Sequence, residues 1–138
     1  MSLMLHSRGM DADRIAHAKA HPPRFLARVE ACRAVVSECD GPALADMLNK
    51  GAAGVIIDVR EVHEFERGHL PGAVHLSKGV LERDIEALVP DVNRRVVLYC
   101  GGGFRSAIAG ASLRDMGYVD VWSVWGGWRA IRAAGLAD

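Results

Sequence analysis

Residues 54–59 read Gly-Val-Ile-Ile-Asp-Val, a nearly unbroken apolar run rich in β-branched side chains. Such a run is typical of a strand that is buried on both faces, and strands of this kind occur in parallel sheets covered by helices. Further short strands are predicted at residues 34–36, 73–76, 95–99 and 119–124. Segments with helical spacing separate them, at residues 42–51, 62–67, 80–89, 105–116 and 128–134. The alternation predicts an α/β fold in which a parallel sheet lies between helices.

Two further helical segments precede this pattern. Residues 10–20 have helical spacing and are closed by a His-Pro-Pro sequence, because the residue before a proline disfavours the helical conformation. Apolar residues at positions 25, 26, 29 and 32 fall on one face of a second helix. Residues 1–9 are expected to be disordered. We therefore expect an N-terminal helical extension, residues 1–33, and one α/β domain, residues 34–138.

The composition limits the class of protein. The chain has 138 residues, 50% of them hydrophobic, which suffices for one buried core. Its 17 basic and 17 acidic residues leave no net charge, so a binder of nucleic acid or of anionic membranes is not expected. No apolar run approaches the roughly 18 residues of a membrane span, and the first residues lack the apolar stretch of a secretory signal. A soluble protein of the cytoplasm is therefore expected.

The cysteine and histidine residues do not form a metal-binding pattern. Cys32 and Cys39 lack a CxxC partner and are interpreted as small apolar core residues. His63, His69 and His75 recur every six residues, a spacing that matches neither an HExxH helix nor a zinc finger. No metal and no cofactor are therefore expected.

The strongest functional signal is residues 100–106, Cys-Gly-Gly-Gly-Phe-Arg-Ser, which follow the predicted strand 95–99. Ligands of parallel α/β sheets bind where a strand ends and the next helix begins. Adjacent glycines let backbone N–H groups converge on one anion, and the helix N-terminus adds partial positive charge. A free cysteine is mostly protonated at neutral pH. This loop, together with Arg105, is expected to stabilise the Cys100 thiolate and so to provide a nucleophile.

We therefore expect a reactive site at this loop; the alternative is a buried cysteine at a strand end with no chemical role. Positive φ is expected at Gly102. Arg60, at the end of another strand, either contacts substrate or forms an ion pair with Asp58, Glu64 or another nearby acid. The candidate catalytic residues are Cys100 and Arg105, and the candidate substrate-binding residues are Gly101, Gly102, Gly103, Phe104, Ser106 and Arg60.

Four segments, taken together, resemble the rhodanese (sulfurtransferase) family. They are, in chain order, Asp58-Val59-Arg60 with Glu64-Phe65, then Gly68-His69-Leu70-Pro71-Gly72-Ala73, the loop from Cys100 to Arg105, and Val124-Trp125-Gly126-Gly127-Trp128. The resemblance covers about residues 35–136, most of the chain. It implies a rhodanese-like fold, a five-stranded parallel sheet with helices on both faces.

The resemblance also implies a reaction. A Cys100 thiolate would take the outer sulfur of a donor such as thiosulfate, and the persulfide would pass that sulfur to cyanide, a thiol or a sulfur-accepting protein. Arg105 would orient the anionic donor. The expected partners are thus a small anionic sulfur donor and such an acceptor, with the chain acting as a monomer or a homodimer.

Two other functions stay open. The domain could be a sulfur-relay or binding module without independent turnover. Arsenate reductases and dual-specificity phosphatases resemble the same fold, but those phosphatases carry one more residue between cysteine and arginine and usually a histidine before the cysteine. Here four residues intervene and Tyr99 precedes Cys100, so sulfur is favoured over a phosphoryl group.

Overall fold

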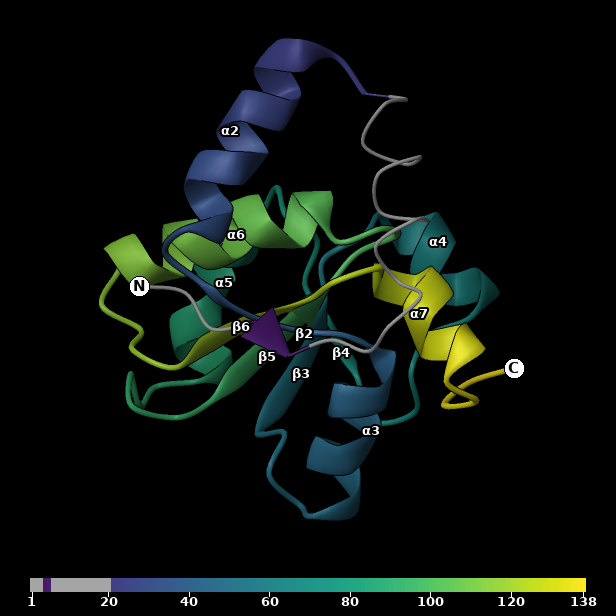
Figure 1. The fold of residues 1–138 in the computed structure, drawn as a ribbon. Coiled ribbons are helices and arrows are strands. Elements are labelled where there is room, and N and C mark those ends of the chain that lie inside the picture. The colour runs from purple at the N-terminus through teal and green to yellow at the C-terminus, as the bar shows by residue number, and fades with distance from the viewer. Residues whose placement is uncertain (1–3, 6–20) are drawn as a thin grey trace.

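The computed structural model describes residues 4–5 and 21–138, which form one parallel sheet with helices on both faces (Figure 1). The strands are β1 (Met4–Leu5), β2 (Ser37–Cys39), β3 (Val55–Asp58), β4 (Val74–His75), β5 (Val96–Tyr99) and β6 (Val121–Val124). Their order in the sheet is β1-β2-β6-β5-β3-β4, and every neighbouring pair is parallel. The predicted α/β fold with a parallel sheet is confirmed, and β1 extends the five expected strands at the edge beside β2.

Two expectations near the N-terminus are wrong. Residues 4–5 are not disordered, because Met4 and Leu5 pair with Glu38 and Cys39 of β2. The strand expected at residues 34–36 lies at Ser37–Cys39 instead, because residues 34–35 form a turn after the preceding helix. The expected helix at 10–20 and the remainder of residues 1–9 lie outside the described residues.

The other expected helices form within a few residues of their predicted bounds. They are α2 (Pro23–Arg33), α3 (Gly41–Asn49), α4 (Val62–Arg67), α5 (Leu81–Leu88), α6 (Phe104–Asp115) and α7 (Gly127–Ala133). Local sequence explains where they begin. Pro23 stands in the first turn of α2, and the Asp40 side chain caps α3 by accepting the N–H of Ala43 at 3.0 Å.

The sheet divides the apolar core into two parts. Val29 of α2, Ile85 of α5 and Ala107 of α6 belong to the part on one face, and Leu44 of α3 and Ile131 of α7 belong to the part on the other. The central strand β5 supplies both parts: its first and third residues face the first, and its second and fourth face the second. This strict alternation explains why a strand at the centre of the sheet reads as a continuous apolar run.

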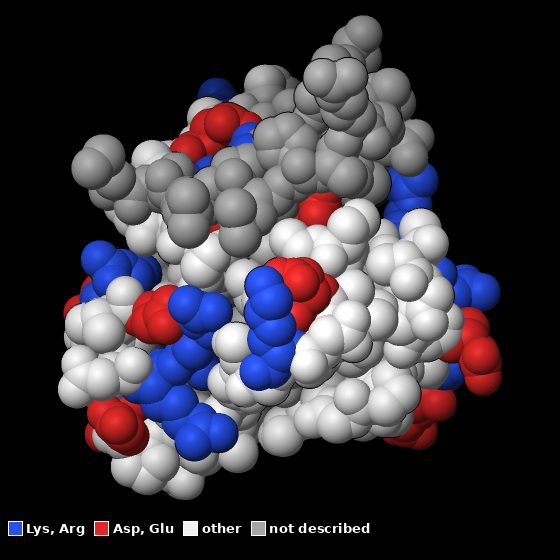
Figure 2. Space-filling model, turned by 60° about the horizontal axis from the view of Figure 1, so that its bottom comes forward, with Lys and Arg blue, Asp and Glu red and all other residues white. Residues whose placement is uncertain are grey.

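On the surface, basic and acidic side chains lie next to one another over the face shown in Figure 2, with uncharged surface between them. This mixture agrees with the balanced charge of the sequence. None of the helices among the described residues combines the length and the apolar character needed to cross a membrane.

Candidate active site

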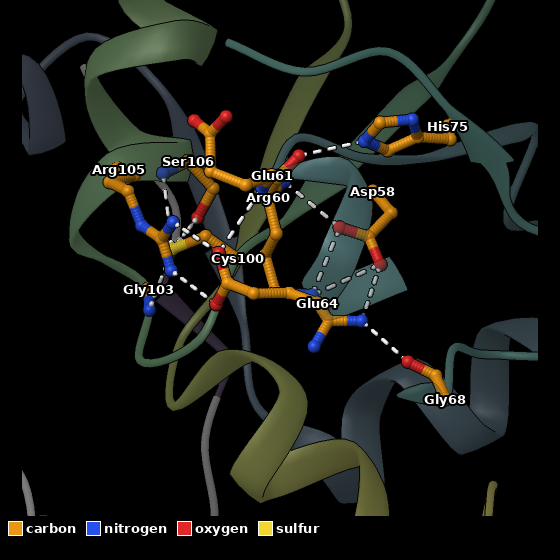
Figure 3. Close-up of polar contacts among 10 residues, drawn as sticks. All are labelled: Asp58, Arg60, Glu61, Glu64, Gly68, His75, Cys100, Gly103, Arg105 and Ser106. Carbon is orange, nitrogen blue, oxygen red and sulfur yellow. Dashed lines mark hydrogen bonds and ion pairs between the residues drawn. The ribbon is translucent and has the colours of Figure 1, made fainter. Parts of the chain in front are cut away.

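Cys100 follows the last residue of β5 at the carboxyl edge of the sheet, and 1% of the residue is exposed. Its Sγ accepts hydrogen bonds from the backbone N–H of Gly103 at 3.2 Å and of Ser106 at 3.3 Å (Figure 3). Both N–H groups lie at the start of α6, where a helix leaves its first amides without intrahelical partners. These donors, together with the positive end of the helix, stabilise negative charge on the sulfur.

Gly103 gives the loop its shape. It precedes the first residue of α6 with φ 99° and ψ 0°, in the left-handed region that favours glycine. The expectation that Gly102 needs positive φ is therefore wrong, because among the loop glycines Gly103 adopts it. A Cβ at Gly103 would also lie 3.1 Å from the backbone N of Gly126 and the backbone O of Val124. A side chain there would strain the turn and push it off the neighbouring loop.

Two buried hydroxyl groups continue from the sulfur into the sheet. Ser106 Oγ lies 3.5 Å from Cys100 Sγ, and it is 2.7 Å from Ser123 Oγ of β6. Neither serine is exposed. Ser106 was expected at the site, but Ser123 was not, because its place beside the loop follows from the pairing of β5 with β6.

The segment after β6 holds the cysteine loop through backbone hydrogen bonds. The backbone N–H groups of Gly126, Trp128 and Arg129 donate to the carbonyl oxygens of Gly102, Cys100 and Gly101, at 3.2, 2.7 and 3.4 Å. Gly127 has φ 52°, and a Cβ there would collide with the carbonyl oxygen of Cys100. The paired glycines after β6 thus let two strand-to-helix turns touch through their backbones.

Arg105 forms a two-pronged ion pair with Glu64 of α4, with Nη1–Oε1 at 2.9 Å and Nη2–Oε2 at 3.3 Å. Hydrogen bonding to Arg105 outweighs partial burial and holds the pKa of Glu64 below its usual value. Hydrogen bonding to Glu64 and the nearby Cys100 raise the pKa of Arg105, against the effect of burial. Glu64 therefore stays charged at neutral pH and holds the guanidinium beside the cysteine. From the sequence, Glu64 was expected as part of a family motif and as one possible partner of Arg60, and its pairing with Arg105 was not predicted.

Arg60 forms its ion pair with Asp58 and not with Glu64. Its Nη2 lies 2.7 Å from Asp58 Oδ2, its Nε lies 3.0 Å from Oδ1, and Nη2 also donates to the Gly68 carbonyl at 2.7 Å. Burial lowers the pKa of Arg60, but the hydrogen bonds and charge of Asp58 outweigh it and leave that pKa raised. Its guanidinium lies 4.9 Å from the centre of the Trp128 ring. Of the two roles considered for Arg60, the ion pair is the one that these contacts describe.

A cavity of about 400 Å³ opens over the sulfur. Its lining includes six of the eight candidate site residues, namely Cys100, Gly101, Gly102, Phe104, Arg105 and Arg60. The remaining two, Gly103 and Ser106, contact the sulfur through their amides. The tertiary structure thus gathers every candidate residue around Cys100. It adds lining residues that sequence reasoning missed, namely His21, Phe25, Glu64, Trp128 and Arg129.

Over residues 21–138, no three His, Cys, Asp or Glu side chains lie together so that they could hold a metal ion. His69 Nδ1 is 2.9 Å from the Phe65 carbonyl, and its ring stacks on Phe65 at 3.7 Å between centres. His75 Nε2 is 2.7 Å from the Arg60 carbonyl. His69 and His75 thus contact backbone carbonyl groups of α4 and of the residue Arg60 that precedes it.

Proteins similar in sequence to this chain include a sulfurtransferase, a putative sulfur carrier and a tRNA hydroxylase. The chain is 34% identical over 83 residues to thiosulfate sulfurtransferase GlpE of Stutzerimonas stutzeri, which covers 60% of this chain and 74% of GlpE. It is 35% identical over 74 residues to the putative sulfur carrier protein YrkF of Bacillus subtilis, covering 54% of this chain and 39% of YrkF. It is also 33% identical over 90 residues to tRNA uridine(34) hydroxylase of Salmonella typhimurium, covering 59% of this chain and 26% of the hydroxylase. The match therefore spans well under two thirds of the sulfur carrier and of the hydroxylase.

Solved structures share the fold. A protein of unknown function from Rhodopseudomonas palustris, RPA3614, described as a possible tyrosine phosphatase, has a TM-score of 0.75 and 30% identity, covering 80% of this chain and 90% of that one. Thiosulfate sulfurtransferase from Pseudomonas aeruginosa has a TM-score of 0.70 and 28% identity, covering 80% and 21%. The polysulfide-sulfur transferase homodimer from Wolinella succinogenes has a TM-score of 0.69 and 28% identity, covering 82% of this chain and 85% of that one.

Residues 41–134, more than half of the chain, match the family of the rhodanese-like domain. The parallel sheet, the cysteine at the end of β5 and the glycine turn that donates N–H groups to its sulfur agree with that match. The protein therefore belongs to the rhodanese-like domain family.

Proposed function

We propose that this chain is a sulfurtransferase that carries a sulfane sulfur as a persulfide on Cys100. The observation that carries the proposal is the convergence of the Gly103 and Ser106 N–H groups on Cys100 Sγ at the floor of an open cavity. A nucleophile is activated when its charged form is stabilised by its surroundings, and amides at a helix N-terminus provide that stabilisation.

The reaction has two displacements. The Cys100 thiolate attacks the outer sulfur of thiosulfate, the S–S bond of the donor breaks, and sulfite leaves with the bonding electrons. The persulfide anion on Cys100 then gives its outer sulfur to cyanide or to a thiolate, which leaves as thiocyanate or as a new persulfide and restores the Cys100 thiolate. The amides of the loop bind a negatively charged sulfur at both stages, so no proton has to move at Cys100.

The direct test is the intact mass of the protein after incubation with thiosulfate. We expect one added sulfur atom in the wild type and none in Cys100→Ala. Cys39→Ala is the matched control and is expected to load as the wild type does, because burial raises the pKa of the Cys39 thiol to about 12. Sulfur found on Cys39, or loading that survives in Cys100→Ala, would overturn the proposal.

Arg105→Ala is expected to raise the KM for thiosulfate. A hydrogen bond to a charged group is worth about 1.5–3 kcal/mol, so the loss corresponds to roughly a tenfold to hundredfold increase in KM. The free energy of unfolding should change by less than about 1 kcal/mol, because partly exposed ion pairs contribute little; the side chains of Arg105 and Glu64 are 36% and 28% exposed. Steady-state sulfite release, measured beside Arg83→Ala on α5, checks the prediction. An unchanged KM would remove Arg105 from donor binding.

A sulfur-relay module is the second candidate, and the similarity to a putative sulfur carrier protein favours it. In that case Cys100 loads once but passes its sulfur to a partner protein and not to cyanide. Thiocyanate formation with thiosulfate and cyanide in excess separates the two: repeated turnover supports the enzyme, and a single loading event supports the relay.

A phosphatase is the third candidate, because RPA3614 is described as a possible tyrosine phosphatase. The four residues between Cys100 and Arg105 make a small loop, with Gly103 and Ser106 amides already on the sulfur. We expect that loop to fit a single sulfur atom in preference to a phosphoryl group. Release of nitrophenol from an aryl phosphate at an enzymatic rate would reverse this order.

A further inference from the structure

Helix α2 lies outside the family match, yet the segment that starts it forms part of the active-site cavity. The match begins at residue 41, whereas α2 spans Pro23–Arg33. His21, just before the helix, and Phe25, in its first turn, both line the cavity above Cys100. The cavity therefore has one wall that lies outside the residues of the family match.

That wall is aromatic. His21 and Phe25 have ring centres 5.2 Å apart, and both face the ring of Phe104, at 4.8 and 6.2 Å. Phe104 is the first residue of α6, beside the cysteine loop, and its ring meets that of Trp125 edge-on at 5.3 Å. These ring distances are those of packed aromatic pairs. The wall thus joins α2 to the cysteine loop through Phe104.

Contacts along its length fix α2 against the domain. Val29 and Cys32 are buried in the core beneath it. At its far end, Arg33 forms an ion pair with Glu38 of β2 at 3.0 Å, and its guanidinium lies 4.3 Å from the centre of the Trp125 ring. Figure 1 shows α2 beside α6 on one side of the sheet, and the two helices are in contact. The aromatic wall is therefore held in place and can select what enters.

The cavity is larger than an inorganic donor requires. Its volume of about 400 Å³ falls in the range of roughly 300–1,000 Å³ that is typical of sites for organic ligands. Trp128 lines the cavity together with the aromatic wall. The charged residues of the lining are three cations, Arg60, Arg105 and Arg129, and one carboxylate, Glu64. An anion with an apolar group attached matches both kinds of lining, because the charge meets guanidinium groups while the apolar group covers aromatic rings.

We propose that His21 and Phe25 are specificity-determining residues that make the site selective for sulfane-sulfur donors carrying an apolar organic group. This inference rests on the sulfur-transfer function proposed above. In the reaction, the Cys100 thiolate attacks the outer sulfur of R–S–S⁻ or R–SO₂–S⁻, and the bond to the inner sulfur breaks. The organic thiolate R–S⁻ or sulfinate R–SO₂⁻ leaves with the electron pair, and its group R lies against the wall.

The test compares benzenethiosulfonate with methanethiosulfonate, two donors that undergo the same displacement and differ in the apolar group. We expect the wild type to show a kcat/KM roughly tenfold or more higher for the benzene donor, since apolar groups in a fitted pocket discriminate on this scale. Phe25→Ala and His21→Ala should each bring the ratio of the two kcat/KM values closer to one, mainly by lowering kcat/KM for the benzene donor. In both variants, kcat/KM for thiosulfate, which carries no apolar group, should fall by a smaller factor than kcat/KM for the benzene donor.

Leu26→Ala is the matched control. Leu26 packs against the same core from the same turn of α2 but does not line the cavity. It should keep the wild-type donor ratio even where stability falls, which separates a specific wall from a general loosening of α2. The inference is overturned if the wild type does not prefer the benzene donor. It is also overturned if Phe25→Ala lowers kcat/KM for both donors by the same factor. Failure of all three donors to load Cys100 would instead overturn the proposed function itself.

Discussion

Gly103→Val is expected to slow sulfur loading of Cys100 by about two to three orders of magnitude, the usual cost of displacing a preorganised N–H donor from a reacting anion. The Gly103 N–H donates to Sγ at 3.2 Å, and it does so from φ 99°, where a β-branched residue is strained. The valine Cβ would also press on the backbone of Val124 and Gly126. Both effects move the amide away from the sulfur.

The measurement is the rate of sulfite release on mixing with thiosulfate. Gly117→Val is the matched control, because Gly117 has φ 103° but nothing within 4 Å of its Cβ direction, and it lies beyond the end of α6. Strain at such a position costs about 1–3 kcal/mol of unfolding free energy, and the loading rate should not change. Equal loading rates for Gly103→Val and the wild type would show that this amide does not act on the sulfur.

Asp58→Asn is expected to lower the free energy of unfolding by about 3–5 kcal/mol, because removing one partner of a buried ion pair leaves the other charge uncompensated. The side chains of Asp58 and Arg60 are 0% and 4% exposed. Asp58 also accepts the backbone N–H of Arg60 at 2.9 Å. A loss of this size is a large share of the roughly 5–15 kcal/mol that stabilises a typical domain.

Urea denaturation measures this loss, and two variants sharpen it. Asp46→Asn breaks an ion pair with Lys50 in which the side chains of Asp46 and Lys50 are 62% and 69% exposed. This variant should lose less than about 1 kcal/mol of unfolding free energy. The double variant Asp58→Asn/Arg60→Met removes the charge as well as its partner and should recover part of the loss. A cost for Asp58→Asn as small as that for Asp46→Asn would contradict the assignment of a buried pair.

Short-range patterns in the sequence predicted most of the scaffold. The apolar run of β5, Val96–Tyr99, reads as a strand because alternate side chains enter opposite halves of the core. β2 was misplaced because it contains Glu38, whose carboxylate is buried in an ion pair with Arg33. A local pattern cannot anticipate a charged residue in a strand when tertiary packing supplies its partner.

The same distinction holds at the candidate site. Cys100, the three glycines after it and Arg105 form one continuous segment, so local chemistry pointed to them. The sequence also placed the left-handed glycine at position 102, whereas the backbone of the neighbouring loop fixes it at Gly103. Which of several glycines takes positive φ depends on what packs against the turn.

By itself, the sequence determined the parallel α/β fold and the loop that holds the cysteine, since both follow from residues within a few positions of one another. The tertiary structure alone decided that Glu64 holds Arg105, and that His21 and Phe25 of the N-terminal segment form a wall above the sulfur. These contacts join separate elements of the chain. Their proximity depends on how the helices pack on the sheet, and no local spacing of residues specifies that packing.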